Sequence, residues 1–106
     1  MLTEKDKQAL IKLPNDMLAT FRARVMLTEM PESILRFYEE NASQINGDVV
    51  VVRSKAQESN AAYLRNNSPK VLFVFGHEYW VDRYFSSVCD RVNLPGPLLK
   101  RAKRAS

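Results

Sequence analysis

The sequence predicts a single-domain protein of the α/β or α+β class, with three N-terminal helices followed by a β-α-β-α unit. Three observations carry this prediction. The chain has 106 residues, which is the common size of one domain. Apolar residues in the first half recur at the three- and four-residue spacing of helices. The second half contains two short apolar runs, residues 49–52 and 71–75, typical of strands buried on both faces.

The three N-terminal helices are delimited by a cap and two prolines. Thr3 can cap the first helix, which we expect to end before Pro14. A second helix is predicted over residues 15–30 from its apolar spacing. Pro31 suits the first position of a third helix, because its missing N–H would have no partner there. That helix should end before residues 46–47.

The second half is predicted to form a small parallel sheet. Ser54 and Gln57 have the spacing of a capping box, which places a helix after the first strand. The second strand is followed by apolar residues at helical spacing, which predicts a last helix over residues 78–91. Two buried strands joined by a helix favour a parallel βαβ unit with a two-stranded sheet. Such a sheet is marginal alone, so we expect its edges to be covered or paired in a homodimer.

The charge distribution divides the chain into a globular domain, residues 1–96, and a basic C-terminal tail, residues 97–106. Basic residues number 16 and acidic residues 12, and the excess of four is matched by Lys100, Arg101, Lys103 and Arg104. The rest of the chain is therefore formally neutral, and a neutral domain does not predict a wide phosphate-binding face. The four tail cations are the predicted contacts with nucleic acid or with a protein partner. The alternative interpretation is a solubilising tail that contributes little to stability.

Composition also restricts the compartment. No apolar stretch approaches the roughly 18 residues that a membrane span requires, and the N-terminal residues lack the pattern of a secretory signal. Cys89 is the only cysteine, so no intramolecular disulfide can form. The sequence therefore predicts a cytoplasmic protein that does not enter the membrane.

One histidine is the main candidate for chemistry. His77 and Glu78 follow the second strand directly, and ligands of parallel α/β folds bind at the carboxyl ends of strands. His77 could act as a base or a metal ligand, although a capping or surface role is the commoner one. On the predicted helix, Cys89 would lie about 18 Å from His77, which excludes a catalytic pair. We therefore interpret Cys89 as a small buried hydrophobe and predict no metal site.

Cofactor and nucleic-acid motifs are absent from the sequence. The three glycines form no phosphate-binding pattern, so no cofactor is predicted. Arg53, Ser54 and Lys55 stand at a predicted helix start and could form an anion site, although a plain capping box explains Ser54 equally well. Residues 17–41 resemble a helix-turn-helix only loosely, because glutamates on the third helix would repel DNA. The clustered aromatic residues of the second half could stack on bases, although their spacing favours packing in the core.

Three functions remain at this point. The leading hypothesis is a small non-enzymatic interaction protein that binds and modulates a larger protein or nucleic-acid-processing complex, as phage- or plasmid-type accessory and inhibitor proteins do. The alternative is a direct DNA- or RNA-binding regulator. The third is a small enzyme that uses His77 and Glu78.

Overall fold

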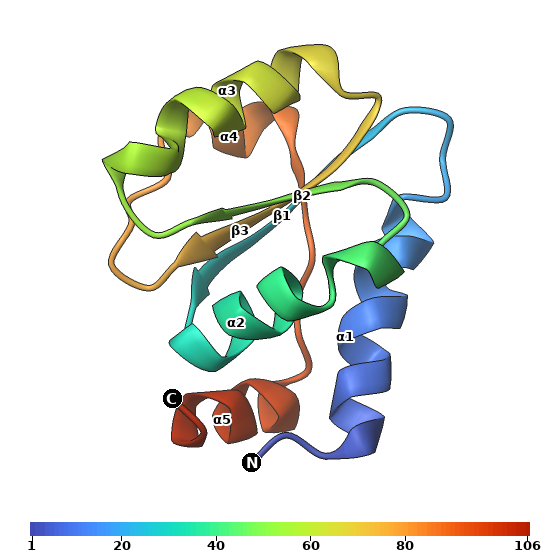
Figure 1. The fold of residues 1–106 in the computed structure, drawn as a ribbon, viewed down its shortest axis with the longest axis vertical. Coiled ribbons are helices and arrows are strands. Elements are labelled where there is room, and N and C mark those ends of the chain that lie inside the picture. The colour runs from blue at the N-terminus through green and yellow to red at the C-terminus, as the bar shows by residue number, and fades with distance from the viewer.

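The computed structural model describes residues 1–106 and is built around a sheet of four parallel strands. The strands lie in the order β2-β3-β1-β4. Helices α1, α2 and α5 cover one face of the sheet, and α3 and α4 cover the other (Figure 1). The strands are β1 (Ala23–Met30), β2 (Asp48–Val52), β3 (Lys70–Gly76) and β4 (Asp90–Arg91). The helices are α1 (Glu4–Met17), α2 (Glu32–Glu40), α3 (Glu58–Asn67), α4 (Arg83–Val88) and α5 (Gly96–Arg104), with single 3₁₀ turns η1 (Ala42–Gln44) and η2 (Lys55–Gln57).

This doubly wound, Rossmann-like α/β architecture shows that the predicted fold was wrong. The chain does not have three N-terminal helices or a two-stranded sheet, because residues 15–30 do not form one helix. They contain the end of α1, a turn, and strand β1 at the centre of the sheet. Alternate residues of β1 enter opposite cores: Val25 and Leu27 face α1 and α2, whereas Met26 faces α3 and α4. A strand buried on both faces lacks the polar alternation that distinguishes it from a helix.

Helix α1 continues through Pro14, where the sequence predicted its end. A proline in a helix interior frees the carbonyl four residues earlier, which here belongs to Leu10. The hydroxyl of Tyr38 on α2 donates a hydrogen bond of 2.6 Å to that carbonyl, in a buried position. Tyr38 itself is fully buried, so the same bond satisfies its hydroxyl. Pro14 is therefore tolerated inside the helix because Tyr38, 28 residues after Leu10 in the sequence, satisfies the carbonyl that the proline leaves free.

The predicted last helix over residues 78–91 is also wrong. This segment contains a loop, the short helix α4 and the two-residue strand β4. Asp82 fixes the start of α4 by accepting a hydrogen bond of 2.9 Å from the backbone N–H of Phe85. Cys89 is buried beside α4, as expected, and burial raises the pKa of its thiol to about 11.

The basic segment 97–106 is integrated into the fold rather than being a loose tail. It forms most of α5, whose Leu98 and Ala102 are buried in the lower core, which lies between the sheet and helices α1, α2 and α5. Ala102 also accepts a hydrogen bond: its carbonyl oxygen lies 2.6 Å from the Ser33 hydroxyl, which donates to it from the start of α2. The two chain ends lie on the same side of the sheet (Figure 1). Removing residues 97–106 would therefore expose apolar core, contrary to the expectation from sequence.

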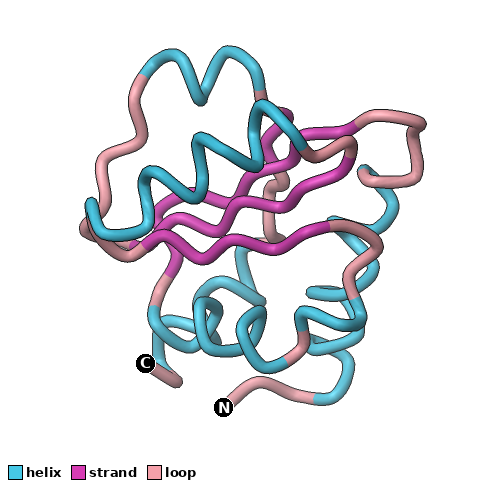
Figure 2. Tube along the Cα trace, turned by 45° about the horizontal axis from the view of Figure 1, so that its top comes forward, coloured by secondary structure: helices cyan, strands magenta, loops and turns pink.

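The remaining architecture agrees with simple rules of burial. Every buried polar side-chain atom has a hydrogen-bond partner, as the cost of unsatisfied groups requires. The structure contains no helix that is both long enough and apolar enough to cross a bilayer. Figure 2 shows the strand layer with helices on both sides.

A bidentate ion pair joins α1 to α5. Arg101 donates to both carboxylate oxygens of Asp6, at 2.8 Å and 2.6 Å. The backbone N–H of Thr3 donates to the same carboxylate, and the Thr3 hydroxyl accepts from Asp6, which completes the predicted helix cap. The hydrogen bonds from Arg101, followed by that from Thr3, hold the pKa of Asp6 well below its ordinary value of 3.8.

This geometry predicts an acid-dependent loss of stability. Because the folded-state pKa is depressed, the contribution of Asp6 is complete above the unfolded-state pKa and is lost as pH falls through the folded-state pKa. Thermal melts should show Asp6→Asn less stable than the wild type near neutral pH, and the difference should shrink below about pH 4. Asp16→Asn is the control, because its ion pair with Lys12 is exposed and should matter little. A difference for Asp6→Asn that did not change with pH would contradict this account.

Candidate functional site

The candidate site lies where the connections after two neighbouring strands diverge. β1 and β3 are adjacent and parallel. The chain leaves β1 towards α2 on one face, but leaves β3 towards α4 on the other. Ligands of doubly wound sheets bind at such a switch point, outside the carboxyl ends of the strands. The topology therefore brings the predicted residues His77 and Glu78 to the expected place.

Two shallow depressions meet at the carboxyl ends of these strands, and His77 and Glu78 line both of them. The first has a volume of about 360 Å³ and includes Glu29, Trp80 and Arg91 among its lining residues. The second has a volume of about 290 Å³ and lies between the start of α2 and the end of β2. Carboxylates and cations are mixed in both, so neither depression has a uniformly basic wall.

Glu29 enters the first depression from a strained part of β1. Its φ of 58° is the one positive value among the non-glycine residues. The strain coincides with a break in the register between β1 and β3, between Leu27 and Met30. A left-handed conformation costs a non-glycine residue about 1–2 kcal/mol, and such strain often occurs at functional sites.

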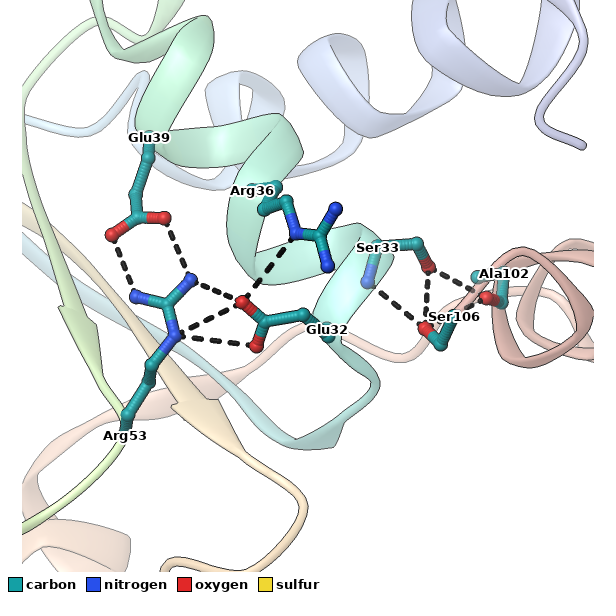
Figure 3. Close-up of polar contacts among 7 residues, drawn as sticks. All are labelled: Glu32, Ser33, Arg36, Glu39, Arg53, Ala102 and Ser106. Carbon is teal, nitrogen blue, oxygen red and sulfur yellow. Dashed lines mark hydrogen bonds and ion pairs between the residues drawn. The ribbon is translucent and has the colours of Figure 1, made fainter.

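The second depression is closed on one side by a cluster of charges, shown in Figure 3. Arg53 follows β2 and donates to Glu32 at 2.6 Å and to Glu39 at 2.7 Å. Glu32 and Glu39 lie two turns apart on α2, so one guanidinium connects both ends of that helix to the sheet. Hydrogen bonds from Arg53 lower the pKa of both glutamates. Arg36 adds a weaker contact of 3.6 Å to Glu32.

These contacts oppose an anion site at residues 53–55. The guanidinium of Arg53 is occupied by two carboxylates, and the backbone N–H groups of Arg53 and Ser54 both donate to Gln57 Oε1. The predicted capping box of Ser54 and Gln57 is present, although it caps η2. Lys55 is exposed and makes no ion pair within the chain. The anion site remains a prediction, with Lys55 as its one free cation.

The start of α2 is likewise occupied by groups of the protein itself. In many doubly wound folds this first helix end after β1 receives a phosphate. Here Pro31 provides no side-chain cap, and Glu32 places a carboxylate in the first turn. The backbone N–H of Ser33 donates to the Ser106 hydroxyl at 2.9 Å (Figure 3). The local charge and the C-terminal serine thus disfavour phosphate at this position.

His77 and Cys89 are not brought together. His77 follows Gly76, which pairs with Met30, whereas Cys89 precedes Asp90, which pairs with Val25. Measured along β3, whose residues Leu72 and Gly76 pair with Val25 and Met30, these positions are four strand residues, or about 13 Å, apart. The raised pKa of Cys89 also keeps its thiol protonated near neutral pH. Across the chain, no three His, Cys, Asp or Glu side chains are grouped so as to hold a metal ion.

The sequence did not identify Trp80 as a surface residue. It is 79% exposed, although helical spacing predicted a core position. Its neighbours hold the loop in place: the Tyr79 ring stacks on Phe75 at 5.5 Å, and the Tyr79 hydroxyl donates to Glu58 at 2.6 Å. Asp82 anchors the other end of the loop at the start of α4. The signal available in the sequence was that Asp82 can cap a helix, which would have ended the loop after Trp80.

Comparison with known proteins found no matching family model, curated protein or solved structure.

The strain at Glu29 gives a prediction that separates the backbone from the carboxylate. Glu29→Gly should raise the free energy of unfolding by up to about 1 kcal/mol, because glycine adopts positive φ without steric cost. Glu29→Ala removes the same carboxylate but keeps the strain, so it should not be stabilising. Chemical denaturation of both variants measures the difference. A glycine variant less stable than the alanine variant, as expected where φ is ordinary, would show that the backbone at residue 29 is not strained.

Proposed function

We propose that this protein is a non-enzymatic, cytoplasmic interaction module that binds and modulates a larger protein or complex, as accessory and inhibitor proteins do. The observation that carries the proposal is Trp80, a large aromatic side chain held in solvent by a well-anchored loop. Exposing an indole without a partner is unfavourable. Tryptophan is also among the residues that contribute most to protein interfaces.

Two further features of this part of the chain support a protein contact. Tyr84, four residues later on α4, is 56% exposed, and Arg65 lies over its ring at 4.5 Å. Glu78 and Arg91 border the adjoining depression and would supply a polar rim. An aromatic centre with a mixed-charge rim is typical of protein interfaces. Because groups of the protein occupy the start of α2, this part of the molecule is poorly suited to hold a phosphate.

Trp80 is the only tryptophan, so its fluorescence reports directly on this surface. We expect emission typical of an exposed indole, a shift to shorter wavelength when the partner binds, and at least a tenfold loss of affinity in Trp80→Ala, since hot-spot truncations cost about 2 kcal/mol or more. Photocrosslinking from the exposed Tyr84, which leaves Trp80 in place, recovers the partner. Titration of that partner into each variant provides the measurement.

Phe21→Ala is the matched control. Phe21 is 90% exposed but precedes β1, at the opposite end of the sheet. It should bind the partner with wild-type affinity. Equal losses in both variants, or no loss in Trp80→Ala, would reject Trp80 as the centre of the contact.

A second candidate function is direct binding of DNA or RNA through α5. Arg101 is engaged by Asp6, but Lys100, Lys103 and Arg104 make no ion pairs. These three cations lie within two turns of a helix whose apolar residues face the core. A short row of free cations favours salt-sensitive contact with phosphates.

Neutralising this row should separate the two functions. If α5 binds nucleic acid, changing Lys100, Lys103 and Arg104 together to glutamine should weaken binding and lower the slope of log K against log salt by about 0.7–0.9 per lost phosphate contact. The control changes Lys12, Arg22 and Arg83 to glutamine, which removes the same charge elsewhere. Fluorescence anisotropy at several salt concentrations provides the test. Identical slopes in both triple variants would reject α5 as the phosphate contact.

A further inference from the structure

The two edges of the sheet differ in a way that points to a second interface. On one side the sheet ends in β4, which has two residues, both charged. Short, charged edge strands are a common protection against unwanted pairing. On the other side it ends in β2, which has five residues, of which four are consecutive valines. This edge has no lysine, proline or bulge, and its register with β3 is continuous from Asp48 to Val52.

The outer side of β2 is also accessible between the two helical layers. An open groove of about 300 Å³ follows this edge. Val49, Val50 and Val51 form its floor, Ala42 borders it beside α2, and Asn60 borders it on α3. Val49 and Val51 are only half-buried, although both pack against the lower core. The unpaired backbone groups of an edge strand favour the addition of another strand.

We propose that the occupant of this edge is β2 of a second copy of the chain, in antiparallel orientation, so that two four-stranded sheets become one sheet of eight strands. A twofold axis perpendicular to the sheet would relate the copies and would keep α2 beside α2 and α3 beside α3. Full overlap of the two strands places the central residue, Val50, opposite its own copy. Val49 then lies opposite Val51 of the other copy on the α2 face.

Charge at the strand ends favours this self-pairing. Asp48 begins β2 and Lys55 begins η2 just beyond its end; both are exposed and form no ion pair within the chain. Antiparallel pairing brings the Asp48 end of each strand to the Lys55 end of the other, twice by symmetry. The valine run is its own apolar complement in the same alignment. A parallel pairing would instead place like ends side by side.

Sedimentation velocity over a wide range of concentrations tests the proposal on the full chain. The wild type should form a concentration-dependent dimer. Val49→Lys and Val51→Lys should each raise the dimer dissociation constant by about tenfold or more, because symmetry introduces each lysine twice at a paired edge. Phe21→Lys, which adds the same charge away from this edge, should dimerise as the wild type does. Circular dichroism verifies that each variant is folded.

Cysteine crosslinking tests the alignment with a milder substitution. Under mild oxidation, Val50→Cys should form a covalent dimer, because paired strand residues lie within disulfide range. Val49→Cys should not, since its opposite residue is Val51. A wild type that stays monomeric at every concentration, or a dimer insensitive to both lysine variants, would overturn the proposed interface. Crosslinking at 49 but not at 50 would overturn the proposed alignment.

Discussion

Strand β3 is buried on both faces, and this burial imposes the layered arrangement of the other elements. Six of its seven residues are buried, and they alternate between two cores: Leu72 and Val74 face α1, α2 and α5, whereas Phe73 and Phe75 face α3 and α4. A strand of this kind cannot leave either face to solvent. Its two faces therefore require helices in two layers, and its buried backbone groups require a neighbouring strand on each side. The strand order with β3 beside both β1 and β2 meets that requirement.

The lower helical layer is held by contacts between distant parts of the chain. Tyr38 joins α2 to α1 at the carbonyl that Pro14 leaves free, and Arg101 joins α5 to α1 through Asp6. Ser33 joins the start of α2 to Ala102 near the end of α5. The basic C-terminal segment thus has two faces. One contributes to the core and to a buried carboxylate, and the other leaves three cations free.

The doubly wound topology creates a switch point at the carboxyl ends of β1 and β3, but the N-terminus of α2 beside it is not free to bind a phosphate. Glu32 pairs with Arg53, and Ser106 accepts from the backbone of Ser33, so groups of the protein itself occupy the start of α2. What remains accessible at this edge is the loop that carries Trp80, together with a shallow mixed-charge depression. This arrangement suits a surface that binds another macromolecule, and it connects the fold to the proposed function.

Features that depend only on residues close together in the sequence could be predicted from it. The Thr3 cap, the capping box of Ser54 and Gln57, and the apolar runs of β2 and β3 are encoded within a few positions, and each is present. The features that the sequence did not predict depend on contacts between distant residues. Pro14 remains inside a helix because Tyr38 supplies the missing partner, and β1 is a strand because β3 pairs with it on one side and β4 on the other. Periodicity cannot identify a strand buried on both faces, since its apolar run also fits a helix, and only the distant partners resolve that ambiguity.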